Sequence, residues 1–355
     1  MNRNAYTKMC WLQHAMTLAL AVLVASTARI AWAADGDSDR DDRKFDVDDY
    51  RQRQGFEFPS PKGPGDVTED GRIVILSGTT VFEETAPRSR TFVSLGDLPG
   101  SDFNRFGASF LKLSPDGGRI AVGNNGGASF DHFQVGVFAF PSLAGTWFEV
   151  NSFEGAWINE RFIALTAGVF GTPSIVTAFD THSTDPAHPS NRTIINNIGG
   201  ASGGIAFDKH GNLFTANGFG TTGPSTTGEI KAFPRAQWHA ALHGGPPIDF
   251  EANGTVIVTV LSAAPLGFDV SGNLFVGGGD FFGGGDINFA AFINHEAVRS
   301  ALHGHGPINT GDPAQVRRVD PDPDAGSTYD IIINHEFSEL YLNSTTSHAF
   351  VYRAR

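Results

Sequence analysis

Cysteine is nearly absent from the sequence: Cys10 is the only one among 355 residues. It lies in an N-terminal segment that we expect to be removed on export, so the mature chain should hold neither a disulfide nor a thiol. Exported proteins often depend on disulfides for stability. This chain must instead be held together by its apolar core, to which 30 phenylalanines contribute.

Long apolar runs are also scarce. The only one, at residues 16–25, follows the basic residues Arg3 and Lys8 and falls short of the roughly 20 residues that a membrane-spanning helix needs. Small residues around Trp32 then match the pattern that signal peptidase cleaves. We therefore predict a signal peptide at residues 1–34, cleaved near Ala33-Ala34, a secreted or periplasmic mature protein, and no membrane span.

Positive charge is in short supply. The chain has 25 Lys and Arg against 38 Asp and Glu, which gives a formal net charge of −13. Removal of the signal peptide takes away Arg3, Lys8 and Arg29 and no acid, so the mature charge would be −16. An acidic surface of this kind repels nucleic acids and anionic lipids, and we predict that neither is a partner.

Residues 35–54 are rich in aspartate and arginine, and we expect an acidic, flexible N-terminus there. The spacing of the aspartates resembles a calcium-binding loop. However, Arg40 stands where such a loop needs glycine for a sharp turn. The folded domain is predicted to occupy residues 55–355.

One pattern recurs six times in this domain: a strand, a tight polar turn, a second strand and a loop of small residues. In four of the repeats a third strand ends on the same two letters, Ala-Phe, and a fourth apolar run closes most of the repeats. The copies lie at residues 67–80, 111–127, 156–171, 204–220, 266–283 and 330–346.

Four short strands per repeat of 40–60 residues are typical of a β-propeller blade, because blades stacked around an axis bury both faces of each sheet. We predict an all-β, six-bladed β-propeller. The last copy stops one strand early, at Arg355. An N-terminal strand, "GFEF" at 55–58, is expected to complete it and so close the ring, since an open ring would leave strand edges unpaired.

Two repeats carry inserts after the third strand, at residues 235–250 and 295–310. Both contain the letters "ALHG", 60 positions apart, followed by proline. A glycine stop followed by proline indicates the end of a short helix. We therefore expect helical inserts in blades four and five, which look like a duplicated pair.

The repeat at 204–233, "GIAFDKHGNLFTAN…GEIKAF", resembles the NHL repeat, and the repeat at 266–292 is similar. More broadly, the chain resembles six-bladed propellers of the NHL and SMP-30/gluconolactonase-like class, and "LSPDGGRIAV" is similar to a turn of TolB-like propellers. In such a blade Asp208 and Asp269 would brace the Gly-Asn turns rather than catalyse.

The SMP-30 resemblance implies a divalent cation held in the channel by one Glu and several Asn or Asp residues, and a lactonase activity. This sequence has Ser202-Gly203-Gly204 and Pro265-Leu266-Gly267 where those ligands would be expected. Glycine and leucine offer no side-chain oxygen. We therefore predict no metal site and no cofactor, with Ca²⁺ as the alternative.

A binding face is the leading functional expectation. The loops between second and third strands should gather on one rim, where Asn124, Asn217, Asp280 and Asp286 offer side-chain oxygens beside glycines that let a ligand approach the backbone. The predicted function is an exported, non-catalytic binding or surface-associated protein, acting as a monomer on a protein, glycan or small molecule. The alternatives are a metal-dependent lactonase- or esterase-like hydrolase and a lyase.

Histidines on the inserts are the remaining candidates for metal ligands. His239 and His243 stand four residues apart on the first insert, but the second has Arg299 in place of His239 and no third ligand is evident. Zinc sites need three or four convergent ligands. The sequence therefore favours surface histidines.

Overall fold

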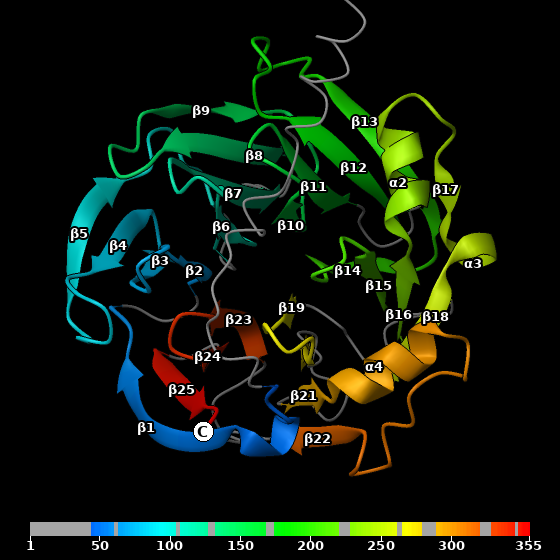
Figure 1. Ribbon diagram of the computed structural model, residues 1–355. Helices are drawn as coiled ribbons and strands as arrows, with labels where there is room; N and C mark the ends of the chain where they lie inside the picture. The colour runs from blue at the N-terminus through cyan, green and yellow to red at the C-terminus, as the bar shows by residue number, and fades with distance from the viewer. Residues whose placement is uncertain are drawn as a thin grey trace, which may run out of the picture. The chain divides into compact units, whose positions relative to one another are not determined.

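The computed structural model describes residues 44–59, 63–103, 107–126, 132–167, 174–219, 228–260, 265–278, 289–319, 328–344 and 347–355. These residues form six β-sheets arranged around a common axis, the predicted six-bladed β-propeller (Figure 1). The innermost strand of each sheet contacts the innermost strand of the next blade, and the last of them contacts the first. The six sheets therefore form a complete ring.

The first five blades run outward from the axis in chain order, each strand antiparallel to the one before it. Blade one is β2 (Gly65–Val67), β3 (Ile73–Ser77), β4 (Thr80–Glu84) and β5 (Phe92–Asp97); blade two is β6 (Leu111–Leu113), β7 (Arg119–Gly126), β8 (His132–Ala139) and β9 (Gly145–Phe148); blade three is β10 (Glu154–Trp157), β11 (Phe162–Ala167), β12 (Ser174–Asp180) and β13 (Asn191–Ile198). Blade four is β14 (Ala201–Phe207), β15 (Leu213–Phe219), β16 (Gly228–Phe233) and β18 (Thr255–Val260); blade five is β19 (Leu266–Phe268), β20 (Leu274–Gly278), β21 (Phe289–Ile293) and β22 (Val316–Val319).

The sixth blade joins the two ends of the described chain. Its strands β23 (Thr328–Asn334), β24 (Glu339–Ser344) and β25 (His348–Arg353) are followed by β1 (Arg51–Glu57), which pairs antiparallel with β25. The pairing runs from Arg51 opposite Arg353 to Glu57 opposite His348. The outermost strand of this blade is thus supplied from the N-terminal side and overlaps the "GFEF" stretch.

The chain just before β1 also packs on the propeller, although the sequence placed residues 35–54 in a flexible segment. A 3-10 helix, η1 (Val47–Asp49), precedes the buried Tyr50, whose hydroxyl donates a 2.9 Å hydrogen bond to Asp269 Oδ2 of blade five. The carbonyl oxygen of Phe45 accepts from Asn273 Nδ2 at 2.8 Å. Residues 44–50 therefore link blade five to the outer strand of blade six.

The core lies between neighbouring blades, as the phenylalanine content suggested. Strand β3 is buried along its whole length, because its two faces pack against the blades on either side. Burial of a phenylalanine side chain contributes about 1.5–3 kcal/mol. Among the described residues, the fully buried phenylalanines are Phe110, Phe138, Phe179, Phe214, Phe233, Phe250, Phe275 and Phe292.

The polar turns between first and second strands are braced by aspartate, as predicted. Asp208 Oδ1 accepts from the backbone N–H groups of His210 and Asn212 at 2.9 and 2.8 Å. Asp269 Oδ1 accepts from the N–H of Asn273 at 2.9 Å in the next blade. Gly211 has a φ of 75°, in the left-handed region that favours glycine. These carboxylates therefore have a structural role.

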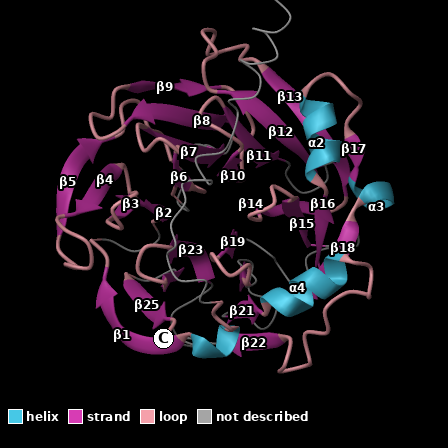
Figure 2. Ribbon diagram, viewed as in Figure 1, coloured by secondary structure: helices cyan, strands magenta, loops and turns pink. Residues whose placement is uncertain are grey.

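The predicted inserts contain helices α2 (Arg235–Leu242), α3 (Phe250–Asn253) and α4 (His295–Leu302), which lie on the outside of the ring (Figure 2). Each insert also reaches back to the outer strand of the preceding blade. The short strand β17 (Ile248–Asp249) pairs parallel with β13, and Ile308 forms a parallel bridge to Val258 of β18. Ile248 and Ile308 are 60 positions apart, so the duplicated inserts repeat this contact as well as the helix.

An ion cluster fastens blade one to blade six. Glu339, almost fully buried, accepts from the Tyr341 hydroxyl at 2.5 Å, from Arg353 Nε at 2.6 Å and from Arg90 Nη2 at 3.1 Å. Arg90 belongs to the connection between β4 and β5 and also pairs with the buried Glu84 at 3.8 Å. The guanidinium of Arg90 therefore bridges carboxylates of two blades.

Among the described residues, no helix has the length and apolar character needed to cross a lipid bilayer.

Candidate functional site

Among the side chains that the structure describes, four acidic or basic ones are carried by the innermost strands, the strands nearest the propeller axis (Figure 1). Asp66 lies on β2, Lys112 on β6, Glu154 on β10 and Asp330 on β23, so blades one, two, three and six each supply one residue. Inner strands of this kind are otherwise apolar or glycine-rich. We name these four residues the channel cluster.

Lys112 is the centre of the channel cluster. Its Nζ lies 3.8 Å from Asp330 Oδ1, and its side chain is 21% exposed whereas that of Asp330 is 5% exposed. Burial alone would lower the pKa of Lys112, but the charges of Asp330, Asp66 and Glu154 together raise it above its ordinary value. Lys112 is therefore an ammonium group at neutral pH.

The two aspartates are oriented by backbone donors of neighbouring blades. Asp66 accepts from its neighbour Val67 N–H at 2.9 Å and from Leu113 N–H of blade two at 2.8 Å. Asp330 accepts from Gly65 N–H of blade one at 2.7 Å. Each carboxylate therefore ties two blades together and is held rigidly beside Lys112. Burial nevertheless raises the pKa of Asp66, against the effect of Lys112 and of these hydrogen bonds.

Glu154 is a protonated member of the channel cluster at neutral pH. It is 6% exposed, and burial raises its pKa to about 8, opposed by Lys112 and reinforced by Asp330. At neutral pH it is mainly a carboxylic acid, which can donate one hydrogen bond as well as accept. The channel cluster then combines the carboxyl groups of Asp66 and Asp330 with one carboxylic acid and one ammonium group.

The proton on Glu154 makes the stability of the fold depend on pH. Between its ordinary pKa of 4.5 in the unfolded chain and about 8 in the folded chain, only the folded state holds this proton. Stability from this group is therefore complete below pH 4.5 and falls as pH rises toward 8, by up to about 1.4 kcal/mol per pH unit. Glu154→Gln, which cannot ionise, should remove that slope. Urea denaturation of both proteins from pH 5 to 8.5 measures it, and parallel stability curves would contradict the assignment.

The channel cluster has donors and acceptors but not the arrangement of a metal site. In the described part of the chain, no three His, Cys, Asp or Glu side chains are grouped so that they could hold a metal ion. What the cluster can do is exchange hydrogen bonds with a polar molecule: the carboxylates accept, and Lys112 and protonated Glu154 donate.

Two of the four predicted rim residues have structural roles. Asn124 is buried in β7, and its Nδ2 donates to the carbonyl oxygen of Asp102 at 3.2 Å. Asn217 is buried near the end of β15, where its Oδ1 accepts from Glu229 N–H at 2.5 Å and so fixes the start of β16. The structure does not bring Asn124 or Asn217 into the channel cluster. Asp280 and Asp286 lie outside the described residues.

Sequence reasoning did not single out the residues of the channel cluster, although a signal was present. Each is a single charged residue set in an apolar or glycine-rich inner strand, as in "LKL" at 111–113 and "GDV" at 65–67. Burial of an isolated charge is costly, so a charge at an inner position of several repeats suggests that the charges meet.

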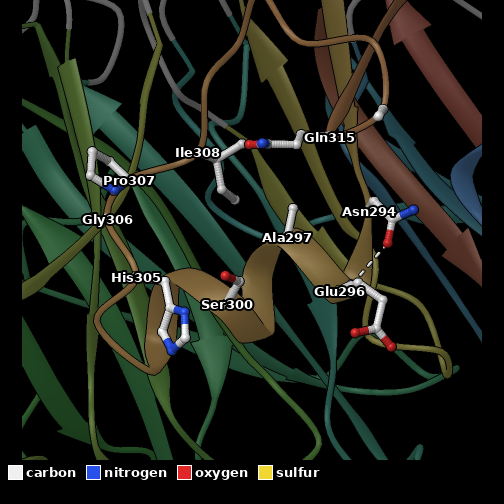
Figure 3. A pocket seen from close by; sticks show the side chains of 10 residues that line it. Asn294, Glu296, Ala297, Ser300, His305, Gly306, Pro307, Ile308 and Gln315 are labelled. Atoms are coloured by element: carbon white, nitrogen blue, oxygen red, sulfur yellow. Dashed lines mark hydrogen bonds between the residues drawn. The ribbon is translucent and has the colours of Figure 1, made fainter.

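A surface pocket of about 230 Å³ lies between α4 and the chain that follows it (Figure 3). Several of its polar groups stabilise the insert. Asn294 Oδ1 caps α4 by accepting from Glu296 N–H at 2.8 Å, and Gln315 Oε1 accepts from Asn309 N–H at 3.1 Å. Ser300 and His305 line the same pocket. Its lining is largely explained by the architecture of the insert.

No family model matches the sequence, and no curated protein matches it. Among solved structures, the chain is similar to the PQQ-bound form of an aldose sugar dehydrogenase from Streptomyces coelicolor, with a TM-score of 0.55 and 13% identity over 85% of this chain and 97% of that one. A chain of a mitotic checkpoint complex gives a TM-score of 0.49 at 12% identity, over 91% of this chain and 98% of that one. Neither comparison places the chain in the NHL-repeat or SMP-30 families. At this identity the first likeness is one of fold, and it agrees with the six sheets: the chain is a six-bladed β-propeller.

Proposed function

We propose that this protein is an exported, non-catalytic binding propeller, and that the channel cluster binds a small, uncharged, hydroxyl-rich molecule. The observation that carries the proposal is the convergence of Lys112, Asp66, Asp330 and Glu154 from four blades. Buried ionised side chains often stabilise a fold no more than the apolar side chains that could replace them. The hydrogen bonds of Asp66 and Asp330 between blades do not by themselves require Lys112 and Glu154 at the axis, and a binding role accounts for the whole set.

The charges favour a hydroxyl-rich ligand over an anion. Carboxyl groups outnumber the single ammonium in the channel cluster, and the whole chain carries a formal charge of −13. Both features repel anions. A hydroxyl group donates to a carboxylate and accepts from an ammonium, so one polyol can engage both kinds of group. Neutral sugars are therefore the natural first probes.

Lys112→Met should weaken the binding of a neutral sugar at least tenfold, because it removes the ammonium donor while keeping the length of the side chain. Isothermal titration of both proteins with a panel of neutral monosaccharides measures the loss. Lys231→Met is the matched control, since Lys231 is a second buried lysine with acidic partners, Glu229 and Glu251, but lies on β16. Equal affinities in wild type and Lys112→Met, or no binding by any sugar of the panel, would contradict the proposal.

The non-catalytic part of the proposal needs its own test. A lactone and ester hydrolysis panel with a calcium titration tests the hydrolase alternative, and product analysis on polymeric substrates tests the lyase. Aldose oxidation with added PQQ is a further assay, suggested by the likeness to the PQQ-bound aldose sugar dehydrogenase. We expect no turnover in any arm. Turnover that Lys112→Met abolishes would replace the binding role with a catalytic one at the same place.

A further inference from the structure

The first insert carries two exposed histidines whose rings lie against each other. His239 and His243 are on adjacent turns at the C-terminal end of α2, with ring centroids 4.1 Å apart and ring planes inclined by 33°. We propose that these two imidazoles form a binding site for a first-row transition-metal cation, with copper(II) held most tightly. This site lies on the outside of the ring and is independent of the channel cluster.

A hydrogen bond fixes which nitrogen of the His243 ring is left for a metal. Its Nδ1 lies 2.8 Å from the carbonyl oxygen of His239 and can only bond to it as a donor. The hydrogen therefore sits on Nδ1, and the lone pair on Nε2 is left for a metal. Metal-binding histidines commonly show this arrangement, in which one nitrogen donates to a carbonyl and the other ligates.

The helix end also favours a cation here. The carbonyl end of a helix carries partial negative charge, which attracts cations. Arg235, one turn earlier on α2, opposes a cation and should weaken the site.

Two protein ligands define the class of metal. Imidazole suits copper, nickel and zinc, and affinity among these divalent ions is highest for copper. Two nitrogens leave further coordination positions to water, so the metal should be exchangeable rather than structural.

The duplicated insert provides a natural comparison. Sixty residues along, α4 has Arg299 at the position of His239 and His303 at the position of His243. Arg299 forms an ion pair with Glu296 on the surface of the helix. The second insert thus keeps the second histidine of the pair but lacks the first, and His303→Ala is a matched control.

Copper(II) titration of the full chain tests the proposal, with calorimetry for affinity and electron paramagnetic resonance for the number of coordinating nitrogens. His239→Ala and His243→Ala should each weaken the strongest site at least tenfold and reduce the two-nitrogen hyperfine pattern to one nitrogen. His303→Ala should leave both unchanged, and Arg235→Gln should tighten binding. Both histidines are exposed, so their replacement should leave the protein folded, and circular dichroism checks this. Wild-type affinity and hyperfine pattern in the His239→Ala and His243→Ala proteins would overturn the proposal.

Discussion

A chain that begins at residue 59 should fail to fold cooperatively, whereas one that begins at residue 44 should fold like the full chain. The longer truncation removes β1 and leaves β25 as an unpaired edge. It also removes the buried side chains of Val47, Tyr50 and Phe58. Each large apolar side chain contributes about 1.5–3 kcal/mol, and a domain of this kind is stable by only about 5–15 kcal/mol in total.

Thermal and urea unfolding of the two truncated chains measure this difference. A point variant keeps the prediction testable if the shorter chain aggregates. A Cβ added at Gly55 would lie 2.6 Å from the carbonyl oxygen of Ala349, so Gly55→Val should disrupt the pairing of β1 with β25. The adjacent Gln54 is exposed, and Gln54→Val is the control. Cooperative, wild-type-like unfolding of both the shorter chain and Gly55→Val would show that β1 contributes little.

Glu339→Ala should lower the free energy of unfolding by about 3–5 kcal/mol. This is the typical cost of removing one partner of a buried ion pair and leaving the other charge uncompensated. The change leaves Arg90 with only the Glu84 carboxylate, and it also removes partners of Arg353 and Tyr341. The guanidinium of Arg90 lies over the ring of Phe56, 4.6 Å from its centroid, so the loss should also loosen β1.

Urea denaturation measures the free energy of unfolding of this variant and of a second variant that removes an exposed ion pair. Glu296 and Arg299 are both exposed on α4, so Glu296→Ala should cost less than about 1 kcal/mol. Glu339→Gln should fall between the two, because the amide keeps an oxygen acceptor but not the charge. A cost below about 1 kcal/mol for Glu339→Ala would mean that the cluster does not hold blades one and six together.

Local chemistry explains why so much of the fold could be predicted from the sequence. The turns at Asp208 and Asp269 are built from residues within four positions of each other. The hydrogen bonds that stabilise these turns could therefore be predicted from the local sequence. The strands repeat, and repetition with nearly continuous apolar character indicates stacked blades. In the inserts, glycine and proline follow each helix and mark its end in the sequence.

The rest depends on contacts that no local pattern encodes. The predicted rim position Asn217 offers a side-chain oxygen, but the fold uses that oxygen for the N–H of Glu229. Lys112 and Asp330 are 218 positions apart and meet only because the ring brings blades two and six to one axis. The docking of Tyr50 on Asp269 likewise joins distant segments, and its acidic surroundings in sequence suggested flexibility instead. Convergence of this kind follows from closure of the ring.

Nitrogen-15 NMR of the Lys112 ammonium, assigned by comparison with Lys112→Met and followed during titration with neutral sugars, tests the channel cluster most directly. The raised pKa of Lys112 keeps the group protonated and observable at neutral pH. Binding at the channel cluster predicts a Lys112 resonance that shifts and saturates with the sugar, while the Lys231 resonance stays fixed. A Lys112 resonance that does not move at saturating sugar would contradict the assignment of the channel cluster as the binding site.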